Sequence, residues 1–335
     1  SLNILYPLYV MIFNKLSDYF NVIPNELHFL FVPELSTEYN SFYKMNPEYG
    51  KGTFNIIYPI DEAIILIGDF TPQYNFEKVS EINQNYVEIS KFDTTSSSYK
   101  VGKKHKKRVE VGISCYINNN KLIQVFCDKN KAVKFVKIVL TENYFNTFLR
   151  NNYINNYKDF KSNFYYISQN PVSPELSFIF NQIETCKLNG IAQKMYLESK
   201  ILEILSFITY KNNNRNEKKK TSLKVSSTDK LLLKKCIKLF QNNLSAYPSL
   251  NELASICCMS VSKFLLAFKY LYGVSPYKYL KNMRMEAALD LLLDIENKIT
   301  VISENLGYKN SGHFAKLFKE YYGISPKEYR NKNIE

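Results

Sequence analysis

From about residue 27 to residue 140 the apolar positions come in short runs, which are rich in β-branched and aromatic residues and are separated by Asn, Gly, Pro and Asp. Such runs predict β-strands, because a strand buries its apolar side chains over only a few residues. The segment INNNK at 117–121 has the composition of a hairpin turn. The spacing predicts an antiparallel sheet that closes into a barrel or a sandwich. The predicted strands are 27–33, 53–59, 62–68, 85–92, 109–117, 121–126 and 132–140.

After residue 140 the apolar residues recur with the period of a helix. Helices are predicted over 142–153, 174–187 and 191–210. The last of them carries a broad apolar stripe, formed by Met195, Ile201, Leu202, Leu205 and Ile208. Two interpretations stay open: these helices pack on the β-rich domain, or the stripe is a dimer interface.

The first 20 residues are apolar, but polar residues and Pro7 interrupt them too often for a membrane span. Their spacing predicts an amphipathic helix instead, with Ile4, Leu8, Ile12 and Leu16 on one face. No membrane partner is expected.

Residues 211–229 (KNNNRNEKKKTSLKVSSTD) have almost no apolar side chains and carry six lysines and arginines. Because such a segment cannot bury enough surface to order itself, a flexible basic linker is predicted over 211–228. The formal charge of the chain is +13, divided as +2 over 1–210, +5 over 211–228 and +6 over 229–335. The positive charge therefore lies at the C-terminal end, where it favours an anionic partner.

The C-terminal region contains an internal duplication. FLLAFKYLYGVSPYKY at 264–279 aligns with FAKLFKEYYGISPKEY at 314–329 at a constant offset of 50, with eight of the sixteen positions identical. Apolar residues recur at i, i+3, i+4, i+7 and i+8 from Phe264 and from Phe314, so one face of a helix is buried in each copy. Phe264, Phe268, Phe314 and Phe318 are predicted to be core residues.

Each copy also predicts where its helix stops. Gly273 and Gly323 stand where a helix ends in a residue with positive φ, and a Ser-Pro pair follows each, which is typical of the start of a new helix. A shorter helix is predicted before each copy, capped by Ser249 over 250–257 and by Thr300 over 301–306. A short helix, a turn and a second helix form a helix-turn-helix arrangement.

Between the copies, residues 276–294 have a strong helical pattern. At about 1.5 Å per residue this helix is roughly 28 Å long, close to the ~34 Å between successive major-groove faces of B-DNA. One chain is therefore expected to place two recognition helices in adjacent grooves on one side of the duplex.

Residues 229–335 resemble the DNA-binding domain of the AraC/XylS family of bacterial transcription regulators. The pattern LAxxxxMSxSxFxxxFKxxxGxSPxxY is met from Leu253 to Tyr279, the second half of the family pattern from Ile302 to Arg330, and Arg284 and Ala288 match the connecting helix. The segment YLESKILEIL at 196–205 and the layout before it are faintly similar to siderophore-sensing members of the family.

In the resembled family the exposed face of each second helix contacts the bases. Carried over by position, the base-reading residues are Ser262, Leu265 and Leu266 in the first copy and Gly312, His313 and Lys316 in the second. Phosphate contacts, which set the register without reading sequence, are expected from Ser260, Lys263, Lys269, Lys309, Ser311 and Lys319.

The two predicted reading faces differ in chemistry. Leucines cannot form the bidentate hydrogen bonds that identify guanine or adenine, so the second copy is expected to carry more hydrogen-bond readout. The first is expected to contribute phosphate contacts and apolar or shape reading of A·T-rich sequence. The alternatives are that Leu265 and Leu266 pack on a neighbouring helix or on the N-terminal domain, that His313 has no role, and that the lysines are only solvated.

Little in the chain favours catalysis or a cofactor. No nucleotide-binding loop, nucleophile elbow or HExxH motif is present, and the three histidines are scattered. The cysteines show no C-x-x-C spacing, so buried, reduced thiols are expected at Cys115, Cys127, Cys186, Cys236, Cys257 and Cys258. No cofactor or metal is expected, and the protein is predicted not to be an enzyme.

The sequence thus predicts an α+β protein: a β-rich, ligand-sensing domain at 1–140, a helical segment at 141–210 that is a candidate for dimerisation, the linker, and an AraC-type double helix-turn-helix domain at 229–335. The expected partners are double-stranded promoter DNA, RNA polymerase, a small-molecule or peptide effector at 1–210 and a second copy of the chain. A cytoplasmic, nucleoid-associated location is expected.

Three alternatives remain open. The protein is an architectural DNA-binding protein without an effector, or a catalytic β-domain is fused to a DNA-binding tail. Within the β-rich part, HKKR at 105–108 either attracts an anionic ligand or only decorates a hairpin.

Overall fold

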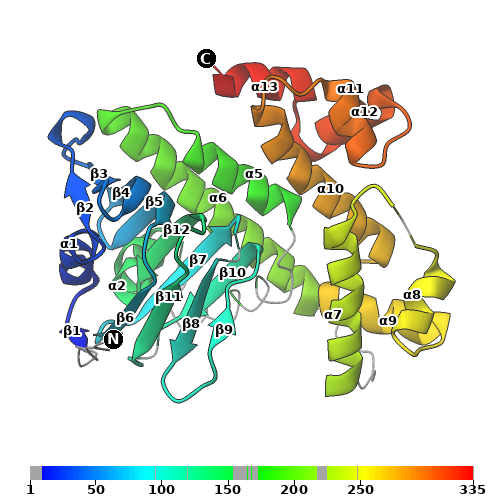
Figure 1. Cartoon of the computed structure of the whole chain (residues 1–335), viewed down its shortest axis with the longest axis horizontal. Helices are drawn as coiled ribbons and strands as arrows, with labels where there is room; N and C mark the ends of the chain where they lie inside the picture. Colours follow the sequence, from blue (N-terminus) through cyan, green and yellow to red (C-terminus); the bar gives the residue numbers. More distant parts are fainter. Residues whose placement is uncertain are drawn as a thin grey trace. The chain divides into compact units, whose positions relative to one another are not determined.

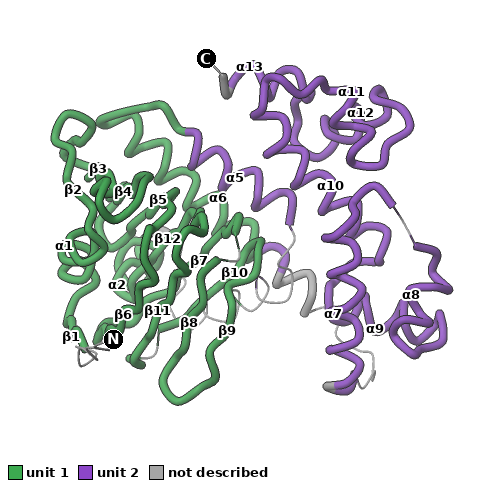
Figure 2. Tube along the Cα trace, in the orientation of Figure 1, with its two compact units in different colours: residues 1–165, 186–209 green, residues 166–185, 210–335 purple. Residues whose placement is uncertain are grey.

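The computed structural model describes residues 10–94, 96–118, 120–153, 164, 167, 173–216, 225–246 and 248–334. The chain divides into two compact units (Figure 2). The first comprises residues 1–165 and 186–209, and the second comprises 166–185 and 210–335. The segment up to residue 185 therefore belongs to the second unit, although the chain afterwards returns to the first.

Two β-sheets form the body of the first unit (Figure 1). The strand order is β10-β7-β12-β5-β4-β3-β2 in the seven-stranded sheet and β1-β6-β11-β8-β9 in the five-stranded sheet. The strands are β1 (Met11–Phe13), β2 (Phe29–Phe31), β3 (Asn40–Met45), β4 (Gly50–Ile60), β5 (Ala63–Pro72), β6 (Phe76–Ile82), β7 (Tyr86–Phe92), β8 (Ser97–Val101), β9 (Lys107–Arg108), β10 (Gly112–Ile117), β11 (Ile123–Cys127) and β12 (Val133–Thr141).

One apolar cluster, contributed by both sheets, forms the core of this unit. On β5 the alternate residues Ile64, Leu66 and Phe70 are buried in it, as the two-residue period of a strand requires. Gly68 lies between them because the ring of Phe135 occupies its place: a Cβ atom there would meet that ring at 2.6 Å. The predicted β-rich first part is therefore confirmed.

All seven predicted strands are present with shifted ends, but the connection predicted at 117–121 is wrong. β10 ends at Ile117 in the seven-stranded sheet and β11 begins at Ile123 in the five-stranded sheet, so the segment crosses between sheets and makes no hairpin. Asn118 is buried at this crossing, where its amide donates hydrogen bonds to the carbonyl oxygens of Ile82 (2.9 Å) and Gln84 (2.8 Å).

The N-terminal helix predicted from Ile4 to Leu16 is also wrong where the structure describes it. Met11–Phe13 form β1, which pairs in parallel with β6 and so departs from the antiparallel pattern that was expected. The helix α1 (Leu16–Glu26) begins only at Leu16. Ile4 and Leu8 lie outside the described residues.

The helices predicted in the middle of the chain are present. Residues 142–153 form α2 (Glu142–Tyr144), a π-helical turn (Phe145–Leu149) and α3 (Arg150–Tyr153). The long α6 (Gly190–Asn216) covers the predicted helix at 191–210 and continues into the predicted linker, of which 217–224 lie outside the described residues. Its buried stripe is Leu197, Ile201, Ile204, Leu205 and Ile208, whereas Met195, which was assigned to the stripe, is 65% exposed.

The second unit is helical. Two cores lie side by side in it, one around Phe264 and Phe268 and the other around Phe314 and Phe318, so these four residues are buried as predicted. The helices are α5 (Pro174–Glu184), α7 (Ser227–Asn242), α8 (Leu250–Ile256), α9 (Val261–Tyr272), α10 (Pro276–Leu293), α11 (Ile299–Asn305), α12 (Ser311–Tyr322) and α13 (Pro326–Ile334).

Helix α10 joins the two cores. Its first half contributes Tyr279, Leu280 and Met283 to the first core, and its second half contributes residues from Met285 to Leu292 to the second. The predicted connecting helix at 276–294 is therefore confirmed.

Candidate nucleic-acid interface

Each core holds a short helix, a turn and a longer helix. The axes of α8 and α9 differ in direction by 79°, which is close to the crossing typical of helix-turn-helix units. Ser249 caps α8 as predicted: its hydroxyl accepts from the backbone N–H of Glu252, and the Glu252 carboxylate accepts from the N–H of Ser249. The longer helices α9 and α12 both end at a glycine with φ of 75°, Gly273 and Gly323.

The cap predicted at Thr300 is wrong. Helix α11 begins at Ile299 with Lys298 in the N-cap position, where its side chain makes no cap hydrogen bond. Thr300 lies inside the helix, and its carbonyl oxygen accepts a hydrogen bond from the Ser303 hydroxyl at 2.7 Å. The sequence rule failed here because a threonine one residue inside a helix looks the same as a threonine at its cap.

Helices α9 and α12 expose the same positions. In both, the residues corresponding to Phe264 and Phe268 are buried and the intervening turn is open. Five of the six predicted base-reading residues are exposed, namely Ser262, Leu266, Gly312, His313 and Lys316. Leu265 is half-buried and packs against the first core, as its alternative interpretation expected, whereas Leu266 is 57% exposed.

The predicted phosphate-contacting residues surround these faces. Ser260 caps α9 and Ser311 is the first residue of α12, where Asn310 is the cap and accepts from the N–H groups of Gly312 (2.7 Å) and His313 (3.4 Å). Lys269, Lys309 and Lys319 are exposed. Contact of all these residues with DNA stays a prediction.

Lys263 differs from the other lysines because it has a protein partner. Its ammonium lies 2.9 Å from a carboxylate oxygen of Asp229 in the first turn of α7, and this contact, with the N–H of Ser226, holds the pKa of Asp229 below its usual value. Lys263 therefore ties α9 to α7. The sequence gave no sign of this pair, since Asp229 lies 34 residues away.

Two arginines and a glycine that were noted only as motif matches fix the geometry of the domain. Arg284 on α10 donates to the carbonyl oxygens of Leu244 (2.8 Å) and Ser245 (3.3 Å) in the turn before α8. Gly307, with φ of +78°, lies so close to this turn that a Cβ atom would meet the Ser245 carbonyl oxygen at 2.5 Å. The turn before the first helix pair thus contacts the end of α11 in the second.

Arg330 makes the corresponding contacts on the second copy. From α13 it donates to the carbonyl oxygens of Leu292 (3.1 Å) and Asn297 (2.6 Å), in the turn before α11. Each arginine therefore holds the entry to one helix-turn-helix unit, and Arg284 also borders the other.

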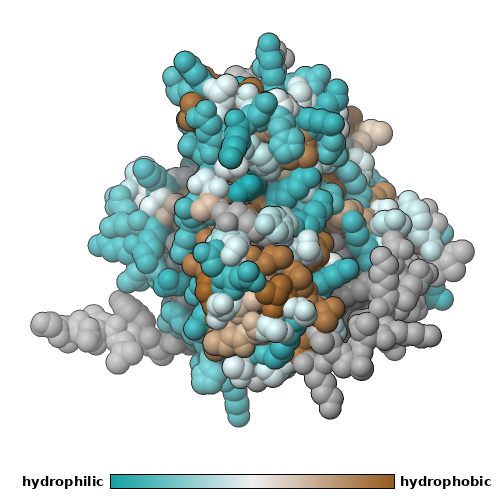
Figure 3. Space-filling view, turned by 90° about the vertical axis from the view of Figure 1, so that its right-hand side faces the viewer, coloured by the Kyte–Doolittle hydropathy of each residue, from teal (hydrophilic) through white to brown (hydrophobic). Residues whose placement is uncertain are grey.

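The exposed surfaces of the two copies differ in polarity. Figure 3 views the side on which α8, α9 and α12 lie in Figure 1; apolar residues gather in its lower half and hydrophilic residues cover most of its upper part. The apolar side chains that α8 and α9 expose are Ile256, Leu266 and Tyr270. Helix α12, which is described throughout, exposes no large apolar side chain.

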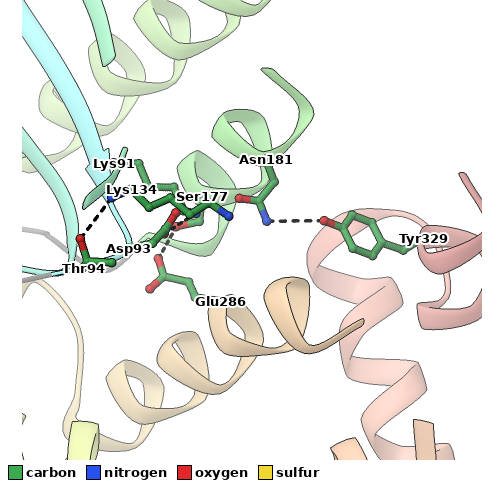
Figure 4. A network of polar contacts seen from close by, with 8 residues as sticks. All are labelled: Lys91, Asp93, Thr94, Lys134, Ser177, Asn181, Glu286 and Tyr329. Atoms are coloured by element: carbon green, nitrogen blue, oxygen red, sulfur yellow. Dashed lines mark hydrogen bonds and ion pairs between the residues drawn. The ribbon is translucent and has the colours of Figure 1, made fainter. Parts of the chain in front are cut away.

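Helix α5 covers the second copy away from α12's exposed face. Phe178 stacks on the ring of Tyr322 with centroids 5.0 Å apart. The Ser177 hydroxyl donates to the Glu286 carboxylate at 2.6 Å, and the Asn181 amide donates to the hydroxyl of Tyr329 at 3.4 Å (Figure 4). Sequence analysis predicted this helix but not its place on the second helix-turn-helix unit.

The cysteines have free thiols, but they are not all buried as predicted. Cys127, Cys236 and Cys257 are buried, Cys115 and Cys186 are half-buried, and Cys258 is exposed. The sulfurs of Cys236 and Cys257 lie 3.2 Å apart in the first core. Within the described residues no three His, Cys, Asp or Glu side chains come together as a metal site, and no single helix is long and apolar enough to cross a membrane.

Two family models match different parts of the chain. One described as "Helix-turn-helix domain" matches residues 253–332, and one described as "Regulatory protein PchR N-terminal domain" matches residues 86–218. Two helix-turn-helix units on a connecting helix, with the exposed faces on α9 and α12, place the protein in the helix-turn-helix class.

Similar proteins carry the same kind of domain. An uncharacterized HTH-type transcriptional regulator of Haemophilus influenzae is 35% identical over 81 residues, which are 24% of this chain and 27% of that protein. Regulatory protein PocR of Salmonella typhimurium is 25% identical over 139 residues, 42% of this chain and 46% of that protein. The matched region thus spans less than half the length of these relatives.

Among solved structures, a DNA-binding transcriptional dual regulator from Escherichia coli K-12 is 26% identical, with a TM-score of 0.28, and the match covers 30% of this chain and 96% of that one. The matched domains and relatives settle the family: the chain belongs to the AraC/XylS family.

Proposed function

We propose that this chain is a sequence-specific DNA-binding regulator of transcription, in which α9 and α12 enter adjacent major grooves of a promoter. The observation that carries the proposal is the repeated exposure on these two helices, where equivalent positions are open around two equivalent phenylalanine cores. A helix-turn-helix unit reads DNA with the N-terminal part of its second helix, which is where Ser262, Gly312 and His313 lie.

The two helices read DNA differently. Lys316 has the donor that an acceptor on a base edge requires, and His313 stands beside it at the start of α12. In the first copy the exposed Leu266 meets thymine methyl groups, while Ser260 and Lys269 contact phosphates. The contact between Arg284 and the turn at Ser245 keeps the spacing of the two helices constant.

The first unit acts as the regulatory part. The similarity of residues 86–218 to the N-terminal domain of regulatory protein PchR supports this role. A small-molecule or peptide effector binds this unit and shifts the balance between two states of the protein, which requires that it bind one state more tightly than the other. RNA polymerase is the partner through which a promoter-bound regulator acts. The protein works in the cytoplasm, at the nucleoid, and it is not an enzyme.

The first half of α6 and the turn before it are the surface through which two copies associate. Leu188, Ile191 and Met195 are exposed there, 46%, 61% and 65% respectively, with a spacing that places Ile191 and Met195 on one face of the helix. Substituting Met195 with Glu is expected to leave the chain folded and to abolish dimerisation in analytical ultracentrifugation.

Selection of DNA from a random pool by the full chain, followed by footprinting, tests the proposal. We expect enriched sequences in which two protected segments lie about one helical turn apart on one face of the duplex. Protection of a single major groove would contradict docking of both helices. Binding without any enriched sequence would instead support the architectural alternative.

A further inference from the structure

The interior between the two sheets of the first unit carries a charged group that no protein atom satisfies. Lys78 on β6 is 7% exposed, and its ammonium has no hydrogen-bond partner among the described residues. The ammonium lies 3.8 Å from the centre of the Tyr19 ring. Burial lowers the pKa of Lys78 to about 6. A buried, unpaired amine is costly for the fold, so its retention requires a reason.

The strand register connects Lys78 with the edge of the five-stranded sheet. Lys78 is opposite Val125, Val125 is opposite Tyr99, and Tyr99 is opposite Lys107. Directly opposed residues point to the same face of a sheet. Val125 and Tyr99 pack against the core of the unit, so this row lies on the inner face, with one lysine deep in it and another at its edge.

The inner face of the seven-stranded sheet provides a wall in which the charges are already paired. Glu88 and Lys137 form an ion pair at 3.0 Å, and the Ser90 hydroxyl donates to Glu88 at 2.6 Å. The Lys137 ammonium lies over the rings of Phe92 and Phe135, 5.2 and 5.1 Å from their centres. Both members of the pair remain partly accessible, 22% and 19%, so the space around them is not closed by the core.

A pocket of about 230 Å³ opens between the sheets at the edge where β8 and β9 lie. Tyr99 of the five-stranded sheet and Tyr116 of the seven-stranded sheet form two of its walls, and the cationic or titratable side chains that border it are Lys104, His105, Lys107 and Lys121. The HKKR segment at 105–108 therefore contributes to a basic entrance and does more than decorate a hairpin.

We propose that the space between the two sheets binds a small organic anion with a flat, ring-bearing body, whose acid group meets the ammonium of Lys78. The tyrosine and phenylalanine rings of both walls contact the flat body, and the basic entrance attracts the negative charge. The anion supplies the partner that Lys78 lacks, because Glu88 is already held by Lys137 and Ser90. This inference rests on the proposed regulatory function of the first unit and names the class of its effector.

Titration calorimetry of the full chain tests the proposal with a matched pair of probes, 2-naphthoate and its uncharged analogue 2-naphthamide. We expect naphthoate to bind the wild-type protein roughly 10- to 100-fold more tightly than naphthamide, as a charge-assisted hydrogen bond to a buried amine provides. Equal affinities, or no binding of either probe, would overturn the proposal.

The substitution Lys78→Met tests the role of the amine. It should remove the preference for naphthoate while leaving naphthamide binding unchanged, and it should raise the melting temperature of the ligand-free protein because a buried unpaired amine is lost. Lys100→Met is the control, since Lys100 is next to Tyr99 on β8 but points to the other face. An unchanged naphthoate affinity in Lys78→Met would contradict the assignment.

A second variant keeps the test independent of folding at the buried position. Lys107→Gln lies at the exposed entrance and should slow the association of naphthoate several-fold, with little effect on dissociation. An unchanged association rate would remove the basic entrance from the proposal. Binding of the selected DNA is measured in parallel: DNA binding without naphthoate binding refutes only this inference, whereas loss of DNA binding in the wild-type protein refutes the proposed function.

Discussion

The two helix-turn-helix copies have nearly the same interior and different exteriors. Around the central phenylalanine, the ring of Phe268 lies 4.7 Å from Tyr272, and the ring of Phe318 lies 4.6 Å from Tyr322. On the outside, the exposed Leu266 of the first copy is replaced by Lys316 in the second. Because base recognition needs only exposed side chains, the reading faces diverge while the packing that holds them stays constant.

The copies also differ in what supports them. In the first, Lys263 reaches Asp229 of α7. The equivalent residue of the second, His313, has its ring 6.0 Å from that of Tyr308, and the support of this copy comes in part from α5 through Phe178. A duplicated unit in this protein therefore has one additional helix on each copy, from different parts of the chain.

The largest expected effect tests the equivalence of the interiors. Phe268→Ala and Phe318→Ala should each destabilise the protein by about 3–5 kcal/mol, since both rings are fully buried. Chemical denaturation followed by circular dichroism measures this, with Tyr270→Ala on the exposed side of α9 as control. A difference of several kcal/mol between the two phenylalanine variants would show that the two cores are not equivalent.

A smaller effect is expected from the arginines that hold the turns. Arg284→Met and Arg330→Met should each cost about 1.5–3 kcal/mol, because each substitution leaves two backbone carbonyl groups without their charged donor. Only Arg284 also borders the second copy, so only Arg284→Met should relax the dependence of DNA affinity on the spacing of the two half-sites. The same spacing dependence in both variants would contradict this division of roles.

The difference between the reading faces is tested at one pair of equivalent positions. Lys316→Ala should weaken binding to the selected DNA by about 1–3 kcal/mol and relax the preference at one base position. Leu266→Ala should cost less, about 1 kcal/mol, because a methyl contact is weaker than a hydrogen bond to a base. Binding to random DNA is the reference, and an equal loss on both DNAs would remove Lys316 from the base-reading residues.

The smallest effect is expected where the copies match again. Lys269 and Lys319 are identical in the alignment and both are exposed. Substitution of either with Ala should weaken all DNA sequences alike and reduce the slope of log affinity against log salt by about one. Unequal slopes would indicate that only one of these lysines contacts a phosphate.

Much of the C-terminal half could be predicted from the sequence because its determinants are local. The helix stops at Gly273 and Gly323 and the buried faces from Phe264 and Phe314 depend on residues within a few turns, and the structure has them where the pattern placed them. The cap at Thr300 failed, since residues next to each other compete for the first position of a short helix.

The β-rich half was predicted less completely because its strands depend on distant partners. β6, β8 and β9 were not predicted, and β6 carries Lys78 where an inward-facing apolar residue is usual. The segment at 117–121 has the composition of a turn, but which sheet each flanking strand joins is decided by pairing with β7 and with β6 and β8. The unpaired amine of Lys78 therefore became visible only in three dimensions.

The position of α5 has a consequence for how this protein is divided into parts. The chain enters the second unit at residue 166, leaves it after residue 185 and returns at residue 210. A fragment cut at the basic linker would contain both helix-turn-helix copies but would remove Phe178 from Tyr322 and Ser177 from Glu286. Chimaeras that exchange C-terminal domains at this linker would thus transplant an incomplete second copy, and the smallest transferable module is discontinuous in sequence.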